Sequence, residues 1–175
     1  MAKEENSELI TFRILRVKDT AFTINENFYL NDKSPTDIKV SVNCELKTNI
    51  DVNLIIVEIF AFYYYDTLVE NQLASIIVQT AFNITDLKNY ETEQRLKLPP
   101  HFLVTLVSIS LSHTRALFSK NIDGTAFNGM IMPLINPEEF SKSIFPEIFN
   151  GTGLSLQDRT KESQIVIPEK LEISS

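Results

Sequence analysis

The sequence predicts an α+β domain, with a four-stranded antiparallel sheet packed against a long C-terminal helix. Three observations predict this class. The first half of the chain contains segments rich in β-branched and aromatic residues, and one of them alternates strictly between apolar and polar side chains. The links between these segments are polar, which favours hairpins or a meander. The second half contains one long apolar segment with the spacing of a helix.

The first strand is expected over residues 9–17, continuing through a bulge into residues 20–24. Residues 25–37 are rich in Asn, Asp, Ser and Pro and are predicted to form a loop, although two bulky aromatic side chains interrupt them. The second strand, residues 37–48, should have one buried and one wet face, which is typical of an antiparallel sheet. Its apolar positions are Ile38, Val40, Val42, Cys44 and Leu46.

Residues 52–66 form the third predicted strand and residues 73–84 the fourth. Both faces of the third strand are apolar, so we expect a second structure or a partner to cover the face that the helix leaves open. Glu58 interrupts this apolar strand, and we expect it at a wet or interface-paired position.

The long helix is predicted over residues 99–120, where two consecutive prolines help to start it. A second helix should begin at Asn136, because asparagine caps well and Pro137 suits the first turn. The expected organisation is therefore a flexible N-terminus (residues 1–8), one domain (residues 9–149) and a polar tail (residues 150–175).

Composition excludes several classes of protein. The 175 residues carry a formal net charge of −7, which disfavours nucleic acid and anionic membrane surfaces as partners. A single cysteine excludes an internal disulfide and fits a reducing compartment. No secretory signal and no uninterrupted apolar span are visible, so we expect a cytoplasmic protein without a membrane-inserted segment.

Candidate catalytic residues are few. His101 and His113 are twelve positions apart on one predicted helix, too far to share a metal ion. Cys44 falls on the apolar side of an alternating strand, where a free cysteine is usually a small buried side chain. The glycines at 151–153 lack the lysine and hydroxyl residue of a phosphate-binding loop. We expect no enzymatic activity, no metal site and no cofactor.

An excess of apolar side chains remains once catalysis is set aside. The sequence has 12 phenylalanines and no tryptophan, and "MIMPLIN" (residues 130–136) places apolar residues beside turn residues. A sheet with two apolar faces and one main helix leaves some of this surface uncovered. Exposed apolar patches of more than a few hundred Å² usually mark a partner.

Two stretches resemble the SecB family of export chaperones. "TFRILRVKDTAF" (residues 11–22) is similar to that family's opening strand, which reads Phe-x-Ile-x-Arg and continues to Lys-Asp and a phenylalanine. Residues 112–140 resemble the family's C-terminal hallmark, a helix end, a glycine turn, an apolar-proline segment and a short helix. The matching positions are Arg115, Gly124, Phe127, Pro133, Asn136 and Phe140.

The resemblance implies a SecB-like fold and a homotetramer built as a dimer of dimers. It implies an ATP-independent holdase that binds unfolded polypeptides in apolar grooves, including precursor proteins destined for export through the Sec translocase. Methionine suits such a groove because its flexible thioether repacks against many client side chains. The client-binding residues expected on this basis are Phe22, Phe28, Tyr29, Phe60, Phe62, Phe127, Met130 and Met132.

Acidic residues on the outer surface of the sheet contact the SecA motor in that family. The resemblance implies such a contact at Asp19 and Leu73, whereas Thr23 and Ser75 stand where the family has acidic residues. The partner is therefore left open between SecA and a dedicated client such as an antitoxin.

Two other functions fit the composition. The chain could be a structural subunit whose apolar surface is fully used in a homo-oligomer, or it could enclose a small apolar ligand between sheet and helix. A structural subunit would show no dye-accessible apolar surface once assembled. A ligand-binding protein would not discriminate unfolded from folded protein.

Overall fold

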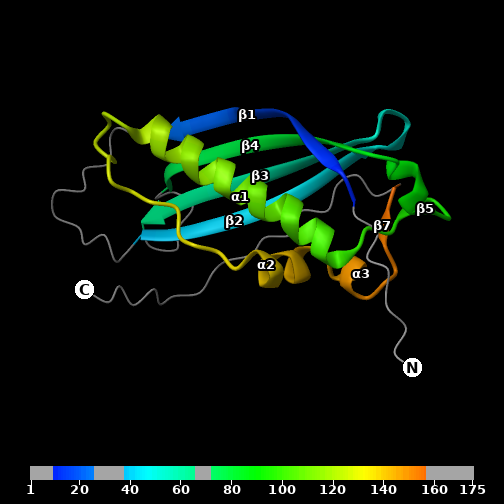
Figure 1. Ribbon diagram of the computed structural model, residues 1–175. Helices are drawn as coiled ribbons and strands as arrows, with labels where there is room; N and C mark the ends of the chain where they lie inside the picture. Colours follow the sequence, from blue (N-terminus) through cyan, green and yellow to red (C-terminus); the bar gives the residue numbers. More distant parts are fainter. Residues whose placement is uncertain (1–9, 26–37, 66–71, 157–175) are drawn as a thin grey trace, which may run out of the picture.

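The computed structural model describes residues 10–25, 38–65 and 72–156 (Figure 1). Its main body is a four-stranded antiparallel sheet with one long helix across one face, which confirms the predicted α+β class. The strands are β1 (Phe12–Ile24), β2 (Ile38–Asn49), β3 (Leu54–Tyr65) and β4 (Gln72–Ile84), and the helix is α1 (Pro100–Ile122). The predicted flexible N-terminus and most of the predicted tail lie outside the described residues.

The strand order is β1-β4-β3-β2. Strands β2, β3 and β4 form the expected meander, but β1 lies beside β4 and not beside β2. Strands β1 and β2 are therefore three strand spacings apart, about 14 Å. A hairpin between β1 and β2 is excluded, and β1 and β2 become the two edges of the sheet.

The core lies between α1 and one face of the sheet. Alternate side chains of β3 and β4 point toward α1, which runs obliquely across the strands in Figure 1. The ring of Phe118 on α1 stacks on Tyr63 with centroids 4.2 Å apart, and Phe22 meets Phe118 edge-on at 6.5 Å. At the other end of α1, Phe102 packs edge-on against Phe12.

Helix α1 is long and apolar enough, by length and composition alone, to cross a membrane. Nine of its side chains are buried, and the seven apolar ones pack in the same cluster as the sheet residues. A long apolar helix with this many buried side chains is typical of the core of a globular domain.

The rest of the chain closes one end of the domain. Helices α2 (Pro137–Ile144) and α3 (Pro146–Phe149) follow α1, and a small sheet forms from β5 (Glu91–Thr92), β6 (Arg95–Leu96) and β7 (Leu154–Ser155). The predicted cap of α2 is confirmed, because the Asn136 Oδ1 accepts hydrogen bonds from the backbone N–H groups of Glu138 (3.0 Å) and Glu139 (3.3 Å).

The Tyr63 hydroxyl is buried and has no hydrogen-bond partner among the described residues. A buried hydroxyl without a partner costs about 1–3 kcal/mol of desolvation. We therefore expect Tyr63→Phe to raise the free energy of unfolding by about 1 kcal/mol, because the stack on Phe118 is kept. Chemical denaturation of both proteins measures the change. A loss of stability would show that the hydroxyl has a partner.

Candidate functional site

The segment of residues 130–136 lies against α1. Together they line a shallow depression of about 130 Å³, which we call the α1 groove. The guanidinium of Arg115 holds the segment in place, because its Nε donates to the carbonyl oxygen of Met132 at 3.2 Å. The lining residues are Ser108, Leu111, Ser112, Arg115, Met132, Pro133, Leu134, Ile135 and Pro137.

Side chains of this segment divide into a buried and an exposed set. Met132 is 1% exposed and Met130 is partly buried, whereas Ile131 is 72% and Leu134 is 79% exposed. Phe127, in the turn before the segment, is also buried. Phe127 and Met132 therefore belong to the core, and direct contact of either side chain with a client stays a prediction.

Ile131 and Leu134 were missed by the sequence reasoning. An extended segment presents successive side chains to opposite sides. The period-two pattern therefore separates Met130 and Met132 from Ile131, whereas Leu134 departs from it, since it is exposed although it lies two positions after Met132. The pattern does not say which of the two sets faces the core, and only the contact with α1 decides that.

Phe60 and Phe62 lie elsewhere, on the face of the sheet that points away from α1. We call this the outer sheet face. Its apolar β3 residues are half-buried, and the rings of Phe62 and Tyr64 stack at 6.4 Å. Since Phe60 and Phe62 are separated from Met130 and Met132 by the whole sheet, the predicted client-binding residues do not form one site.

The other predicted client-binding residues do not join these two surfaces. Phe22 points toward α1 and packs on Phe118, so it supports the core under the end of the helix. Phe28 and Tyr29 lie outside the described residues.

The two predicted SecA contacts are not on the outer sheet face. Asp19 is paired in register with Val78, on the α1 side, and its Oδ2 accepts a hydrogen bond from the Asn121 Nδ2 at 2.9 Å. Leu73 has no exposed surface. The expected outward placement is therefore wrong for Asp19, which lies between two bulges of β1, and Leu73 is too buried to offer an exposed surface. SecA binding stays a prediction.

Glu58 lies in the centre of the outer sheet face and is 6% exposed. Its carboxylate accepts a hydrogen bond from the Gln79 Nε2 at 2.6 Å and forms an ion pair with the Lys47 ammonium. A buried carboxylate needs such partners because its charge has lost its water. The expected wet or interface-paired position is therefore wrong, because Glu58 is buried and both partners come from its own sheet.

Reactive groups are not gathered into a site in the part of the chain that the structure describes, where no cluster of three His, Cys, Asp or Glu side chains could hold a metal ion. His101 is exposed, and the His113 ring lies 3.4 Å from the Thr80 hydroxyl. Burial lowers the pKa of His113 from its usual value, so the neutral ring is favoured at neutral pH.

Cys44 is buried, and this burial raises the pKa of its thiol, with a further contribution from Glu45 and Glu58. The thiolate is the reactive form, so the native thiol should be inert. We expect iodoacetamide to leave the native protein unmodified at pH 8 and to alkylate it fully in denaturant. Intact mass after timed labelling measures both. Rapid native labelling would show that β2 opens.

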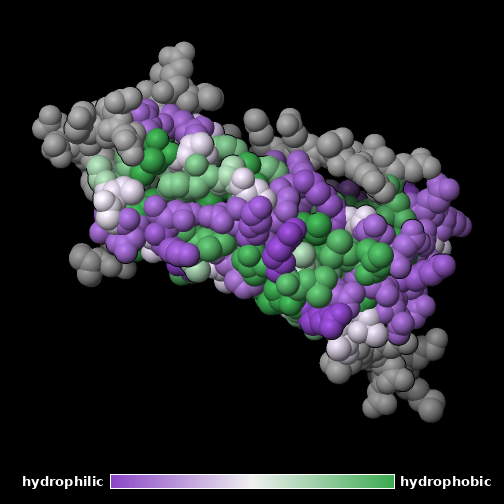
Figure 2. Space-filling view, turned by 90° about the horizontal axis from the view of Figure 1, so that it is seen from above, coloured by the Kyte–Doolittle hydropathy of each residue, from purple (hydrophilic) through white to green (hydrophobic). Residues whose placement is uncertain are grey.

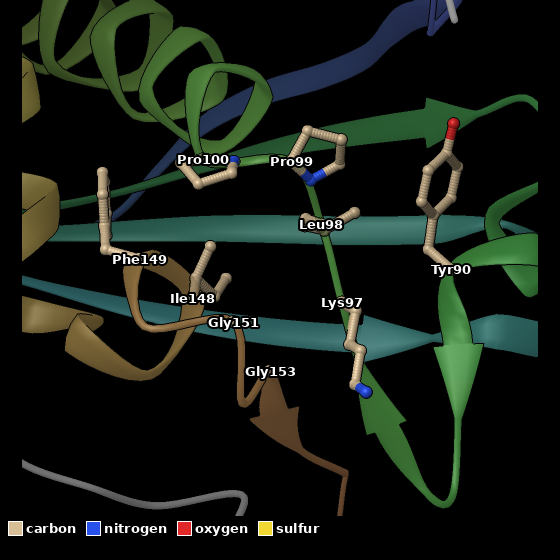
Figure 3. A pocket seen from close by; sticks show the side chains of 9 residues that line it. All are labelled: Tyr90, Lys97, Leu98, Pro99, Pro100, Ile148, Phe149, Gly151 and Gly153. Carbon is tan, nitrogen blue, oxygen red and sulfur yellow. The ribbon is translucent and has the colours of Figure 1, made fainter. Parts of the chain in front are cut away.

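A second depression of about 300 Å³ lies beside the start of α1 (Figure 3). Prolines, aliphatic groups and the ring of Phe149 line it, and the Lys97 ammonium is the cationic group there. Gly153 has to be glycine, because a Cβ would lie 2.9 Å from the Leu96 carbonyl oxygen and its φ is +74°. The full lining is Tyr90, Lys97, Leu98, Pro99, Pro100, Ile148, Phe149, Gly151 and Gly153.

Comparison with solved structures finds several chains of similar fold. The fold is similar to that of the Mycobacterium tuberculosis Rv1957 SecB-like chaperone, solved in complex with a ChAD peptide from the Rv1956 HigA1 antitoxin. Sequence identity is 7%, the TM-score is 0.47, and the alignment covers 71% of this chain and 90% of that chain. No family model and no curated protein matches the sequence.

Proposed function

We propose that this protein is an ATP-independent holdase that binds unfolded polypeptide beside the α1 groove, with Ile131 and Leu134 as the contact residues. The observation that carries the proposal is their exposure. Two large aliphatic side chains stand outside the core on a segment that Arg115 holds against α1. A folded monomer has no structural need for this arrangement, and a client chain would bury both.

Other observations support a binding function. The segment lies in the stretch whose sequence resembles the SecB hallmark, where the resemblance implies a groove wall. Further large apolar side chains are exposed at Ile14 and Leu15 on the edge strand β1.

The energetics require several sites to act together. Full burial of one Ile or Leu contributes about 1.5–3 kcal/mol before ordering costs, so one site holds a client weakly. Three sites of about 100 μM each, joined at an effective concentration of about 1 mM, would give about 1 μM. A homotetramer supplies these copies, and the charge of −7 on each chain keeps assembled particles apart. The proposal includes the tetramer and a cytoplasmic location.

The deciding experiment is a native mass spectrum of the protein alone, with a permanently unfolded client, and with the same client folded. A tetramer that takes up the unfolded client only is the expected result. A monomer, or an assembly indifferent to folding state, would contradict the proposal. If the protein is a structural subunit, a polarity-sensitive dye should also show no increase in fluorescence on mixing with it. If the protein binds a small apolar ligand, it should bind a small lipophile stoichiometrically.

A further inference from the structure

The outer sheet face carries a row of positive charge that neither the fold nor the proposed holdase activity requires. On β1, Arg13, Arg16 and Lys18 stand opposite Asn83, Ala81 and Gln79 of β4. The β4 residues between these three, Phe82 and Thr80, have no exposed surface and point toward α1. All three cations therefore point away from α1.

A bulge produces this alignment. In a regular strand Arg13 and Arg16 would lie on opposite faces, because they are three positions apart. The register shift between Ile14 and Arg16 brings Arg16 and Lys18 onto the face that Arg13 occupies. Since the β4 partners are two residues apart, the cations follow one another at about 6.5–7 Å.

These three cations are exposed and form no ion pair with any residue in the described ranges. On the same face the Lys47 ammonium forms an ion pair with the Glu58 carboxylate, and the Glu45 carboxylate lies 3.8 Å from the same ammonium. The outer sheet face thus has an excess of positive charge on a chain whose net charge is −7. Figure 2 looks onto the β1 edge and shows a hydrophilic band between hydrophobic areas.

Next to the row of cations, apolar side chains extend across the sheet from β1 to β3. Ile77 of β4 and Phe60 of β3 follow Ala21 of β1 in register, and Phe62 and Tyr64 stack beside them. Among the described helices, α1 packs on the opposite face. An occupant of the outer sheet face would therefore meet cations along β1 and a half-buried aromatic surface along β3.

We propose that the outer sheet face binds an extended acidic segment of a partner protein, with carboxylates at alternate positions and apolar residues among them. Side chains on one side of an extended chain recur at about 6.8 Å, which matches the spacing of the β1 cations. Opposite charge favours the encounter and excludes basic segments. This surface is distinct from the α1 groove, which lies on the other side of the sheet.

The test uses fluorescence anisotropy of a labelled ten-residue peptide in which glutamate alternates with leucine. The full-length protein should bind it at low salt, bind it about tenfold more weakly at 0.5 M salt, and leave the same peptide with lysine in place of glutamate unbound. The triple variant Arg13→Gln, Arg16→Gln, Lys18→Gln should lose about tenfold in affinity. Its thermal unfolding and uptake of an unfolded client should match those of the unmodified protein.

A matched control removes the same charge elsewhere. Lys88→Gln, Lys97→Gln and Lys120→Gln change exposed lysines that are not on the outer sheet face, and peptide affinity should stay within twofold. Equal losses in both triple variants, or equal binding of the acidic and basic peptides, would overturn the proposal.

Other occupants would also be revealed. Tighter peptide binding after deletion of residues 157–175 would assign the surface to this chain's own C-terminal segment. Loss of the oligomer in the β1 triple variant would assign it to a second copy. Stronger binding of anionic phospholipid vesicles than of the peptide would assign it to a membrane surface. Each of these results would overturn the proposal.

Discussion

Replacing Ile131 and Leu134 together by aspartate is expected to lower the affinity for an unfolded client about 100-fold. Both side chains are more than two thirds exposed, so the fold should tolerate the change. A client would bury both, and each full burial contributes about 1.5–3 kcal/mol before ordering costs. After those costs a joint loss of about 2.7 kcal/mol remains, which corresponds to 100-fold. Anisotropy of a labelled unfolded client measures the loss.

The control for this variant is Val52→Asp. Val52 is 58% exposed and lies in the short 3-10 turn between β2 and β3, so it tests whether any new surface charge repels clients. Its affinity should stay within threefold. Unchanged binding in the Ile131 and Leu134 variant would remove the α1 groove from the proposed function. Met132→Asp is unsuitable for this test, because it would bury a carboxylate and destabilise the fold.

Phe118→Ala is expected to lower the free energy of unfolding by about 4 kcal/mol, the range for a fully buried phenylalanine. Its ring joins α1 to β3 through Tyr63 and to β1 through Phe22, so its removal opens a cavity where three elements meet. Urea denaturation followed by circular dichroism measures the change.

Phe62→Ala provides the comparison, because Phe62 is half-buried on the outer sheet face and has no helix above it in the described structure. It should cost less than half as much as Phe118→Ala. A cost at Phe62 equal to that at Phe118 would mean that the outer sheet face is covered in solution, and a cost below about 2 kcal/mol at Phe118 would mean that the core there repacks.

Local patterns predicted the elements well. The alternation in β2 placed Cys44 on the buried side, and the sequence Asn-Pro-Glu-Glu predicted the start of α2 at Asn136. Both signals act over a few residues and depend on backbone geometry alone, namely the period of a strand and the unpaired N–H groups of a helix start. Distant contacts do not change them.

The sequence did not predict which residues lie on the same surface when those residues are far apart in the chain. Phe60 and Met132 were expected to contact one client, yet they lie on opposite sides of the sheet. Asp19 was expected on the outer face, and a bulge turned it toward Asn121. A single inserted residue reverses the facing of a strand. The sequence predicted the bulge before residues 20–24 but not the earlier one between Ile14 and Arg16.

Local sequence patterns were enough to predict the α+β class, the four long strands, the long helix, the cap at Asn136 and the excess of apolar side chains. The pairing of β1 with β4, the exposure of Ile131 and Leu134 beside a buried Met132, and the row of Arg13, Arg16 and Lys18 became visible only in the folded chain. The physical reason is that element type depends on local geometry and periodicity. The exposure of a side chain depends instead on which residues, distant in the sequence, pack against it.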